Sequence, residues 1–314
     1  MTRAECEEHV DYDETAALAT AAFATPGLVF GAERLRWFYE RCFSLGSTVI
    51  ALRDEADRKV GQITMVRQTV MVGGRAESAA QLVDLFVSSQ HRGKVALKTL
   101  YDEVEREFVK QDIRFGIGMP NAKAFGVNAH FFKLEPFLLL PFCMGVALPL
   151  PFGRDGVDLP FGPETAAACA EVFARFPTPA SENGVPWAPA GLAERLSAAS
   201  GNRYAVHAVD EVMLISSPRR ARGIAYTLLC GFFARPEGRA SSAAIRRVVS
   251  MACRHWGRPV FAYAGVNTRL AALPGIRMPE KVRPSPMIVQ LRDFKPERGP
   301  LRLDRFQVLD FDFG

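Results

Sequence analysis

Residues 82–100 constrain the fold most, because an apolar strand, a polar turn and a helix follow one another there without a break. Ala79 to Val87 is an apolar segment of strand length. The polar stretch Ser88 to Lys94 comes next, and a helix is predicted from about Val95 to Val109. A buried strand that leads directly into a helix is typical of layered folds in which helices cover a sheet.

The elements on either side of this segment predict a mixed sheet. Helices are expected at 14–24, 32–43 and 121–133, and further strands at 47–52, 60–72, 114–119 and 143–150. Hairpin-linked strands followed by helix crossovers give a mixed central sheet flanked by helices, an α/β (α+β) layer fold.

The second half of the chain partly repeats this order. Residues 153–163 are rich in Gly, Pro and Asp and read as a linker. Helices are expected after it at 164–176, 190–199 and 240–255, and strands at 203–209, 223–233, 260–264, 287–291 and 306–313. A recurrence with a period of roughly 150 residues predicts a duplicated fold, with domains at 1–152 and 163–314.

Charge is divided unevenly between the halves. The chain carries a net charge of +5. Residues 156–314 hold 14 acidic and 21 basic residues, and 19 of the basic residues are Arg. Such a half suits phosphates, carboxylates or an acidic partner. The basic residues are not interleaved with aromatic ones, so the sequence predicts no nucleic-acid partner.

The six cysteines are scattered, without a CxxC pair and without His at metal-ligand spacing. We therefore expect free thiols, a cytoplasmic location and no metal. The longest apolar run, Phe137 to Phe152, is interrupted by three prolines, so no membrane span is predicted. The acidic N-terminus shows no signal peptide.

Gln90 to Lys94 combine the features of an anion site. A helix N-terminus presents free N–H groups and the positive end of the helix dipole. Gly93 allows a phosphate to approach the backbone, and Arg92 and Lys94 add positive charge. The alternative for the same residues is a solvated basic turn.

Residues 79–100 resemble the acyl-CoA site of the GCN5-related N-acetyltransferases, the GNAT superfamily. In that family a strand of the type L-x-V-x-P-x-x-R-G leads into a Q/R-x-x-G-x-G/A loop, and the order of elements over residues 14–150 is similar too. The resemblance implies that the backbone of Leu85, Phe86 and Val87 pairs with the pantetheine arm. It implies a pyrophosphate loop made of Gln90, His91, Arg92, Gly93, Lys94, Val95 and Ala96.

The segment Gly116 to Asn121 resembles the G-x-P-N exit of the next strand in that family. The resemblance implies that Asn121 contacts pantetheine, and the alternative is that it caps a helix. The family's Tyr acid would fall at Asn128, which can only hydrogen-bond, whereas His130 can transfer a proton. Asp84 is the candidate general base, or otherwise an acid that orients the loop.

The resemblance implies an acyltransferase that moves an acyl group from acetyl-CoA or a longer acyl-CoA, or from an acyl-carrier protein, to the amine of a small molecule or peptide. Val95 and Leu97 stand where the family has small residues. An inactive GNAT-fold protein that binds CoA or another anion is therefore the alternative. A serine or cysteine hydrolase is not expected, because the sequence has no G-x-S-x-G and places no Ser or Cys beside a His with a supporting acid.

Overall fold

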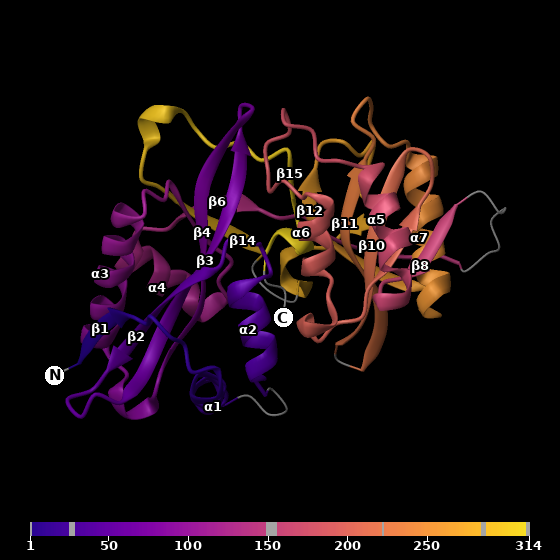
Figure 1. Cartoon of the computed structure of the whole chain (residues 1–314). Helices are drawn as coiled ribbons and strands as arrows, with labels where there is room; N and C mark the ends of the chain where they lie inside the picture. Colours follow the sequence, from indigo (N-terminus) through magenta and orange to yellow (C-terminus); the bar gives the residue numbers. More distant parts are fainter. Residues whose placement is uncertain (1, 25–28, 149–155, 222, 284–286, 312–314) are drawn as a thin grey trace. The chain divides into compact units, whose positions relative to one another are not determined.

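The computed structural model describes residues 2–24, 29–148, 156–221, 223–283 and 287–311. The chain divides into two compact units, and each contains residues from several parts of the sequence (Figure 1). The first unit comprises Met1–Thr69, Glu77–Leu138 and Ile288–Pro300. The second comprises Val70–Ala76, Leu139–Met287 and Leu301–Gly314.

The first unit is built on a seven-stranded sheet with the order β1-β2-β3-β4-β5-β14-β6. In chain order these strands are β1 (Arg3–Cys6), β2 (Ser47–Arg53), β3 (Lys59–Val72), β4 (Arg75–Val87), β5 (Phe115–Gly118), β6 (Glu135–Leu139) and β14 (Ile288–Asp293). β1, β2 and β3 pair antiparallel, whereas β4 and β5 pair parallel. The sheet is therefore mixed, as predicted.

Four helices belong to this unit, namely α1 (Tyr12–Phe23), α2 (Ala32–Glu40), α3 (Lys94–Lys110) and α4 (Ala122–Phe132). α3 is the crossover between the parallel strands β4 and β5. Its buried residues Ala96, Leu100, Val104 and Phe108 recur every four positions, which puts them on one face of the helix. They share a core with residues of the sheet such as Ile63.

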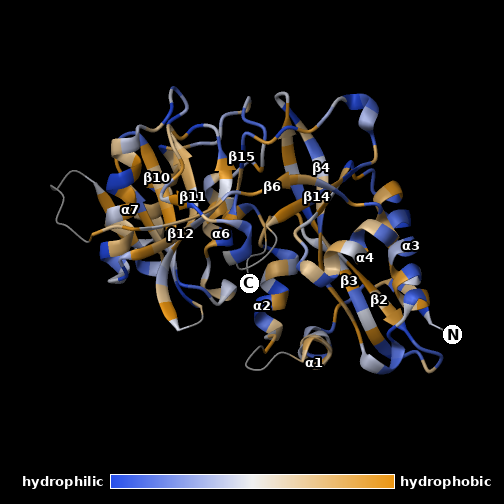
Figure 2. Ribbon diagram, turned by 180° about the vertical axis from the view of Figure 1, so that it is seen from behind, coloured by the Kyte–Doolittle hydropathy of each residue, from blue (hydrophilic) through white to orange (hydrophobic). Residues whose placement is uncertain are grey.

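The second unit is built on an eight-stranded sheet with the order β13-β7-β12-β11-β10-β9-β8, and β15 also pairs with β12. The bounds are β7 (Phe142–Val146), β8 (Val157–Pro160), β9 (Ala205–Ala208), β10 (Val212–Ala221), β11 (Ile224–Ala234), β12 (Val260–Asn267), β13 (Ile276–Arg277) and β15 (Arg305–Gln307). Its helices are α5 (Ala166–Ala174), α6 (Pro189–Arg195) and α7 (Ser242–Trp256). The central strands are largely apolar (Figure 2), as a sheet covered by helices requires.

The two halves of the sequence repeat one motif. In the first half α3 links the parallel pair β4 and β5, and in the second half α7 links the parallel pair β11 and β12. The predicted α/β fold is thus confirmed, and its organisation is consistent with a duplication. In the part of the chain that the structure describes, no helix is long and apolar enough to cross a membrane.

Each sheet contains a strand from the other half of the sequence. β14, from the second half, pairs antiparallel with β5 in the first sheet. β7, from the first half, pairs antiparallel with β12 in the second sheet. This exchange makes both compact units discontinuous in sequence. The domain limits 1–152 and 163–314 stay a prediction, and part of the boundary, 149–155, lies outside the described residues.

Arg114 fixes the exchanged strand β14. Its side chain is 1% exposed and donates to both carboxylate oxygens of Asp293, at 3.2 and 3.1 Å, and to Glu77 at 3.0 Å. A buried guanidinium needs such partners, because an unpaired buried charge is costly. No local pattern in the sequence points to this ion pair, since its members lie up to 179 residues apart.

Most predicted elements are confirmed, and two predictions are wrong. The predicted linker 153–163 contains the strand β8. The predicted strand 306–313 is a strand only to Gln307, and residues 308–310 form a 3-10 turn. The turn forms because the Asp310 carboxylate accepts from the Gln307 N–H at 2.7 Å, and residues 312–314 lie outside the described part. β1, β6, β10 and the two-residue β13 were not predicted.

Candidate functional site

In the first sheet, β5 ends before its parallel neighbour β4 does. Their pairing runs from Ala79 opposite Phe115 to Leu82 opposite Gly118. β5 ends there, whereas β4 continues to Val87. The last part of β4 therefore extends past its neighbour and can offer backbone groups to a ligand on that side.

The helix that follows β4 begins with an open N-terminus. Gly93 is the N-cap residue of α3, and it makes no side-chain cap hydrogen bond within the described chain. The Leu97 N–H already bonds to the Gly93 carbonyl at 3.2 Å, so the N–H groups of the first turn are those that precede it. Gly93 has an extended backbone, and a Cβ there would meet nothing within 4 Å. The space in front of the helix is open.

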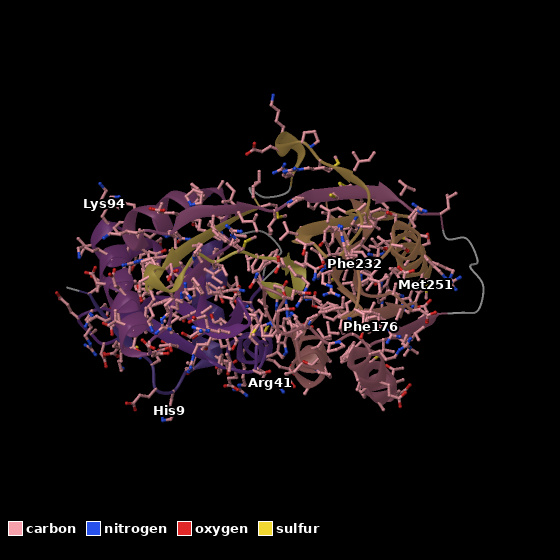
Figure 3. The ribbon with its side chains drawn as sticks, turned by 90° about the horizontal axis from the view of Figure 1, so that it is seen from above. His9, Arg41, Lys94, Phe176, Phe232 and Met251 are labelled. Atoms are coloured by element: carbon pink, nitrogen blue, oxygen red, sulfur yellow. The ribbon has the colours of Figure 1, made fainter. Side chains whose placement is uncertain are left out.

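The side chains of the loop have different roles. Lys94 is exposed and points outward (Figure 3). Arg92 folds back, because its Nε donates to the Val87 carbonyl at 2.9 Å and its Nη2 to the Ala22 carbonyl at 2.6 Å. Arg92 thus ties the loop to the ends of β4 and α1, and Lys94 is left as the cation of the first turn. Val95 is 72% exposed and does not fill the loop from inside.

Asp84 has an unusual backbone conformation for a residue within a strand. Its φ is +50°, a left-handed conformation that Asp adopts more readily than most residues. Its Oδ2 accepts from the hydroxyl of Tyr39 at 2.7 Å, and the Tyr39 oxygen accepts from Gln62 Nε2 at 2.9 Å. Burial, together with the negative charge of Asp84, raises the pKa of Tyr39 well above its usual value. The phenol therefore keeps its proton and donates it to Asp84.

The structure separates the roles of the α4 residues. Asn121 is the N-cap of α4, and its Oδ1 accepts from the N–H groups of Lys123 and Ala124 at 3.0 and 2.9 Å. Asn128 is buried; its Oδ1 accepts from the Tyr101 hydroxyl at 2.6 Å. Its Nδ2 donates to Gln290 at 3.2 Å. The side chain of Asn128 is thus engaged in the core.

His130 lies on the exposed side of the same helix and makes an edge contact with the ring of Phe131. An exposed imidazole can exchange protons with solvent. Among the predicted cofactor residues, Phe86, Val87 and Ala96 are buried. Leu85 and His91 are partly buried, and Gln90 is exposed. His91 Nδ1 lies 2.9 Å from Ser88 Oγ.

Sequence reasoning missed Tyr39, Gln62 and Gly61. A Cβ at Gly61 would lie 2.7 Å from the Phe86 carbonyl oxygen, so β3 and the end of β4 approach each other at a distance that requires glycine. Gln62 is a fully buried amide in β3, a strand that also buries Thr64 and Gln68. Polar residues at buried strand positions need hydrogen-bond partners, and this is the sequence signal that could have indicated one.

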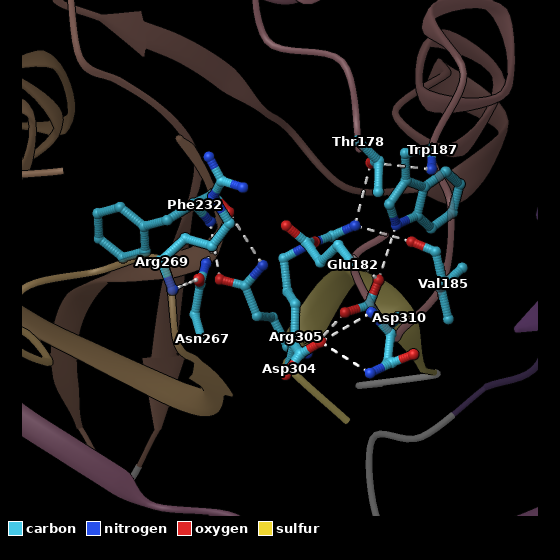
Figure 4. A network of polar contacts seen from close by, with 12 residues as sticks. Thr178, Glu182, Val185, Trp187, Phe232, Asn267, Arg269, Asp304, Arg305 and Asp310 are labelled. Atoms are coloured by element: carbon cyan, nitrogen blue, oxygen red, sulfur yellow. Dashed lines mark hydrogen bonds and ion pairs between the residues drawn. The ribbon is translucent and has the colours of Figure 1, made fainter. Parts of the chain in front are cut away.

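In the second half, the end of β11 corresponds to the end of β4, and other parts of the chain cover it. β15 pairs with β12, with Gln307 opposite Gly265. The Gln307 side chain accepts from the Phe232 N–H at 2.8 Å and donates to the Phe232 carbonyl at 3.2 Å. Asn267 donates to the same carbonyl at 3.0 Å (Figure 4). The backbone groups at the end of β11 are therefore satisfied internally.

The loop between β11 and α7 also has the wrong polarity for an anion. Arg269 Nη2 donates to the carbonyls of Arg235, Pro236 and Gly238, so this loop presents oxygens where an anion site presents N–H groups. The start of α7 is closed as well, because Ser241 Oγ accepts from the Ala244 N–H and Glu211 accepts from the Ser241 N–H. Of the two equivalent crossover helices, α3 has the open N-terminus and α7 has a capped one.

Comparisons with known proteins agree with this geometry. Residues 8–127 match the family model described as an acetyltransferase (GNAT) domain. A comparison with curated protein sequences finds no significant match.

Solved structures resemble the chain over nearly its whole length. A probable N-acyltransferase from Enterococcus faecalis has 13% identity and a TM-score of 0.62, with 93% of this chain and 72% of that one covered. A GCN5-related N-acetyltransferase from Kribbella flavida has 14% identity and a TM-score of 0.60, covering 93% and 71%. N-myristoyltransferase from Saccharomyces cerevisiae has 12% identity and a TM-score of 0.51, covering 92% and 79%.

At such identities the solved structures establish the fold, and the family model identifies the domain. The order of elements, the extension of β4 past the end of β5 and the open start of α3 all fall in the first half, where that model matches. The chain therefore contains, at residues 8–127, a domain of the GNAT acetyltransferase family.

Proposed function

We propose that the first unit binds an acyl-CoA where β4 ends and α3 begins, and transfers its acyl group to an amine. The observation that carries the proposal is the open N-terminus of α3 beside the extended end of β4. Helix N–H groups attract a pyrophosphate. The backbone of Leu85 to Val87 supplies strand-like partners for the amides of the pantetheine arm.

The loop residues divide the work of holding the pyrophosphate. The N–H groups of Lys94, Val95 and Ala96 belong to the first turn of α3, and Gly93 leaves the approach to them open. Lys94 adds a cation. Arg92 holds the loop in place through its contacts to main-chain carbonyls, and Gln90 and His91 complete the turn before it.

Asp84 is the group best placed to accept a proton among the predicted residues. In the proposed reaction the amine nitrogen attacks the thioester carbonyl, a C–N bond forms and the C–S bond breaks. The amine proton passes to Asp84, directly or through a water, and the CoA thiolate takes a proton from solvent or from His130. Asn128 supports Tyr101 and Gln290, and Asn121 supports the start of α4.

The donor is acetyl-CoA or a longer acyl-CoA, and the acceptor is the amine of a small molecule or peptide. The yeast N-myristoyltransferase structure was obtained with bound myristoyl-CoA, which supports testing long acyl chains. An acyl-carrier protein is a further donor to test. The free cysteines fit a reducing cytoplasm, and the filled site in the second half predicts one acyl-CoA per chain.

Isothermal titration with acetyl-CoA, and then with longer acyl-CoAs, tests the cofactor site. Lys94→Ala should weaken binding about tenfold, since one charge-assisted contact contributes about 1.5 kcal/mol. Lys98→Ala is the matched control, because Lys98 lies one turn further along α3 and pairs with Asp102 on the surface. Absence of binding to every acyl-CoA, or equal losses in both variants, would contradict the proposal.

The alternative function is an inactive protein that binds CoA or another anion. Val95 and Asn128, at positions where the family has a small residue and a Tyr, motivate it. A CoA thiol-release assay with a library of amines separates the two functions. Release that depends on an amine and is lost in Asp84→Asn supports the enzyme, whereas tight acyl-CoA binding without any release supports the alternative.

A further inference from the structure

Three side chains with metal-binding atoms converge in the second unit. Asp158 lies on β8, His207 on β9 and His255 near the end of α7. One ligand atom of each lies within 4.8 Å of the other two. Strand pairing places Asp158 directly opposite His207, and the packing of α7 on β8 and β9 adds His255.

The distances suit a small divalent ion. Asp158 Oδ1 lies 2.8 Å from His255 Nδ1 and 3.1 Å from His207 Nδ1. Zn²⁺ binds such atoms at about 2.0–2.1 Å, so two ligands of a tetrahedral ion are about 3.3 Å apart. A small outward movement of the two rings would therefore admit an ion between the three side chains. The side chains of Asp158 and His255 are 24% and 18% exposed, which gives an ion access.

The buried His207 has a hydrogen-bond partner of the kind that orients metal-binding histidines. His207 Nε2 lies 2.7 Å from Ser216 Oγ, and Trp256 Nε1 donates to the same oxygen at 2.8 Å. A metal-bound imidazole usually donates its second N–H to such a partner, which fixes the ring. The hydroxyl of Ser216 can accept from His207 Nε2 when Nδ1 binds a metal, and can donate to it when Nδ1 carries the proton.

The carboxylate directs one oxygen to both rings. Asp158 Oδ1 is the atom that His207 Nδ1 and His255 Nδ1 both approach. Arg254 approaches the other carboxylate oxygen, Oδ2, at 3.8 Å, and leaves Oδ1 to the two rings.

These residues also form a Ser–His–Asp arrangement, which sequence reasoning had excluded. Ser216, His207 and Asp158 are linked in the order that a hydrolase uses. Ser216 is fully buried, however, so its hydroxyl cannot meet a substrate carbonyl. A site for a small ion needs no such access to the serine.

We propose that Asp158, His207 and His255 form a binding site for a divalent transition metal of the Zn²⁺ type, with a fourth position open to solvent. Bound there, the ion would join β8, β9 and α7, and its binding free energy would stabilise the second unit. The sequence gives no sign of this site, because His207 and His255 lie 49 and 97 residues from Asp158 along the chain.

Cobalt titration of the full-length, chelator-treated protein tests the site. Co²⁺ replaces Zn²⁺ at tetrahedral sites and gives a visible absorption band there. We expect one Co²⁺ per chain, displaced by Zn²⁺. Ser216→Ala should weaken binding by about 10–100-fold, as loss of an outer partner does, and His255→Gln by at least as much. His9→Gln is the matched control, since His9 is exposed on the first unit (Figure 3).

A second measurement makes the result independent of folding. His255 is chosen because it is partly exposed, and circular dichroism with chelator present checks that the variant folds. Zn²⁺ should raise the melting temperature of the wild type and of His9→Gln but not of His255→Gln. The proposal is overturned if no visible band develops, or if His255→Gln binds Co²⁺ as tightly as the wild type. None of these results depends on acyl transfer.

Discussion

The Tyr39 hydroxyl on α2 donates to Asp84 Oδ2 on β4 at 2.7 Å. The direction of this bond is set by Gln62, whose Nε2 donates to the Tyr39 oxygen at 2.9 Å, so that the phenol proton is left for Asp84. Asp84 has a positive φ within a strand. Its carboxylate is thus held in one orientation from two elements, as a positioned general base requires.

Tyr39→Phe should reduce the rate of amine-dependent CoA release about tenfold, with acyl-CoA affinity unchanged. A hydrogen bond to the ionised form of a carboxyl favours ionisation, so its loss should also move the acidic limb of the pH–rate profile to higher pH. Both are measured by thiol release at a series of pH values, with titration calorimetry for binding.

Tyr12→Phe is the control for this substitution. Tyr12 also donates its hydroxyl to a carboxylate, that of Glu40 at 3.0 Å, and also packs against α2 through Tyr39. It should lose some stability and keep the pH profile. An unchanged profile in Tyr39→Phe, or the same shift in Tyr12→Phe, would show that Tyr39 does not position the base.

Two glycines near the proposed cofactor site should respond in opposite ways to alanine. Gly61→Ala places a Cβ 2.7 Å from the Phe86 carbonyl oxygen and 3.0 Å from Val87 Cα, and this overpacking should cost about 1–3 kcal/mol of unfolding free energy. Gly93→Ala meets nothing within 4 Å, so its unfolding free energy should stay within about 0.5 kcal/mol of the wild type.

Gly93→Ala, the substitution that leaves stability unchanged, is the one expected to weaken ligand binding. Gly93→Ala places a methyl group where the pyrophosphate is proposed to approach α3, and should weaken acetyl-CoA binding without loss of stability. Urea unfolding and titration calorimetry on both variants check the pair. Equal acetyl-CoA affinity in Gly93→Ala and the wild type would argue against a phosphate at this helix start.

Gln307→Leu should destabilise the protein by at least about 2 kcal/mol. The buried amide accepts from the Phe232 N–H at 2.8 Å and from the Tyr263 hydroxyl at 3.1 Å, whereas the Phe232 carbonyl keeps its bond from Asn267. Each group left without a partner costs about 1–3 kcal/mol. Gln111→Leu is the comparison, since Gln111 hydrogen-bonds Thr48 in a partly exposed position. If chemical denaturation shows equal losses of unfolding free energy in the two variants, the hydrogen bonds of Gln307 at the end of β11 contribute little to stability.

The thiols of Cys230 and Cys253 should react with iodoacetamide at pH 8 only after unfolding. Burial raises the pKa of Cys230 to about 12 and that of Cys253 to about 11, and the thiol form is a poor nucleophile. Peptide mapping by mass spectrometry, with and without denaturant, measures the labelling. Rapid labelling of Cys230 in the native protein would contradict its burial.

The same shifts determine a dependence on alkaline pH. The folded protein holds these thiol protons more tightly than the unfolded chain, in which a thiol has a pKa near 9.0. Above that pH the unfolded state gives up protons that the folded state retains, so the unfolding free energy should fall as pH rises from about 9 to 12. Replacing both cysteines by alanine should reduce this slope.

The sequence by itself determined the layered α/β fold and the candidate loop. The apolar strand that leads through Gln90–Lys94 into α3 is a local pattern, and local patterns are readable from one chain. Two of the missed strands, β1 and β6, depend on partners outside their own segments, whereas the missed β10 forms a hairpin with the adjacent β11. β1 and β6 are edge strands of the first sheet, and their short segments gain stability only from pairing.

Tertiary structure alone decided the rest. Tyr39 and Asp84 are 45 residues apart, and nothing in either neighbourhood indicates that they meet. β14 and β7 exchange between the sheets, and β15 fills the end of β11 in the second half. These are contacts between segments far apart in the chain, where the choice of partner depends on the folded backbone. The physical reason is that hydrogen bonds and buried charges are satisfied by whichever group the fold brings close, which no local pattern encodes.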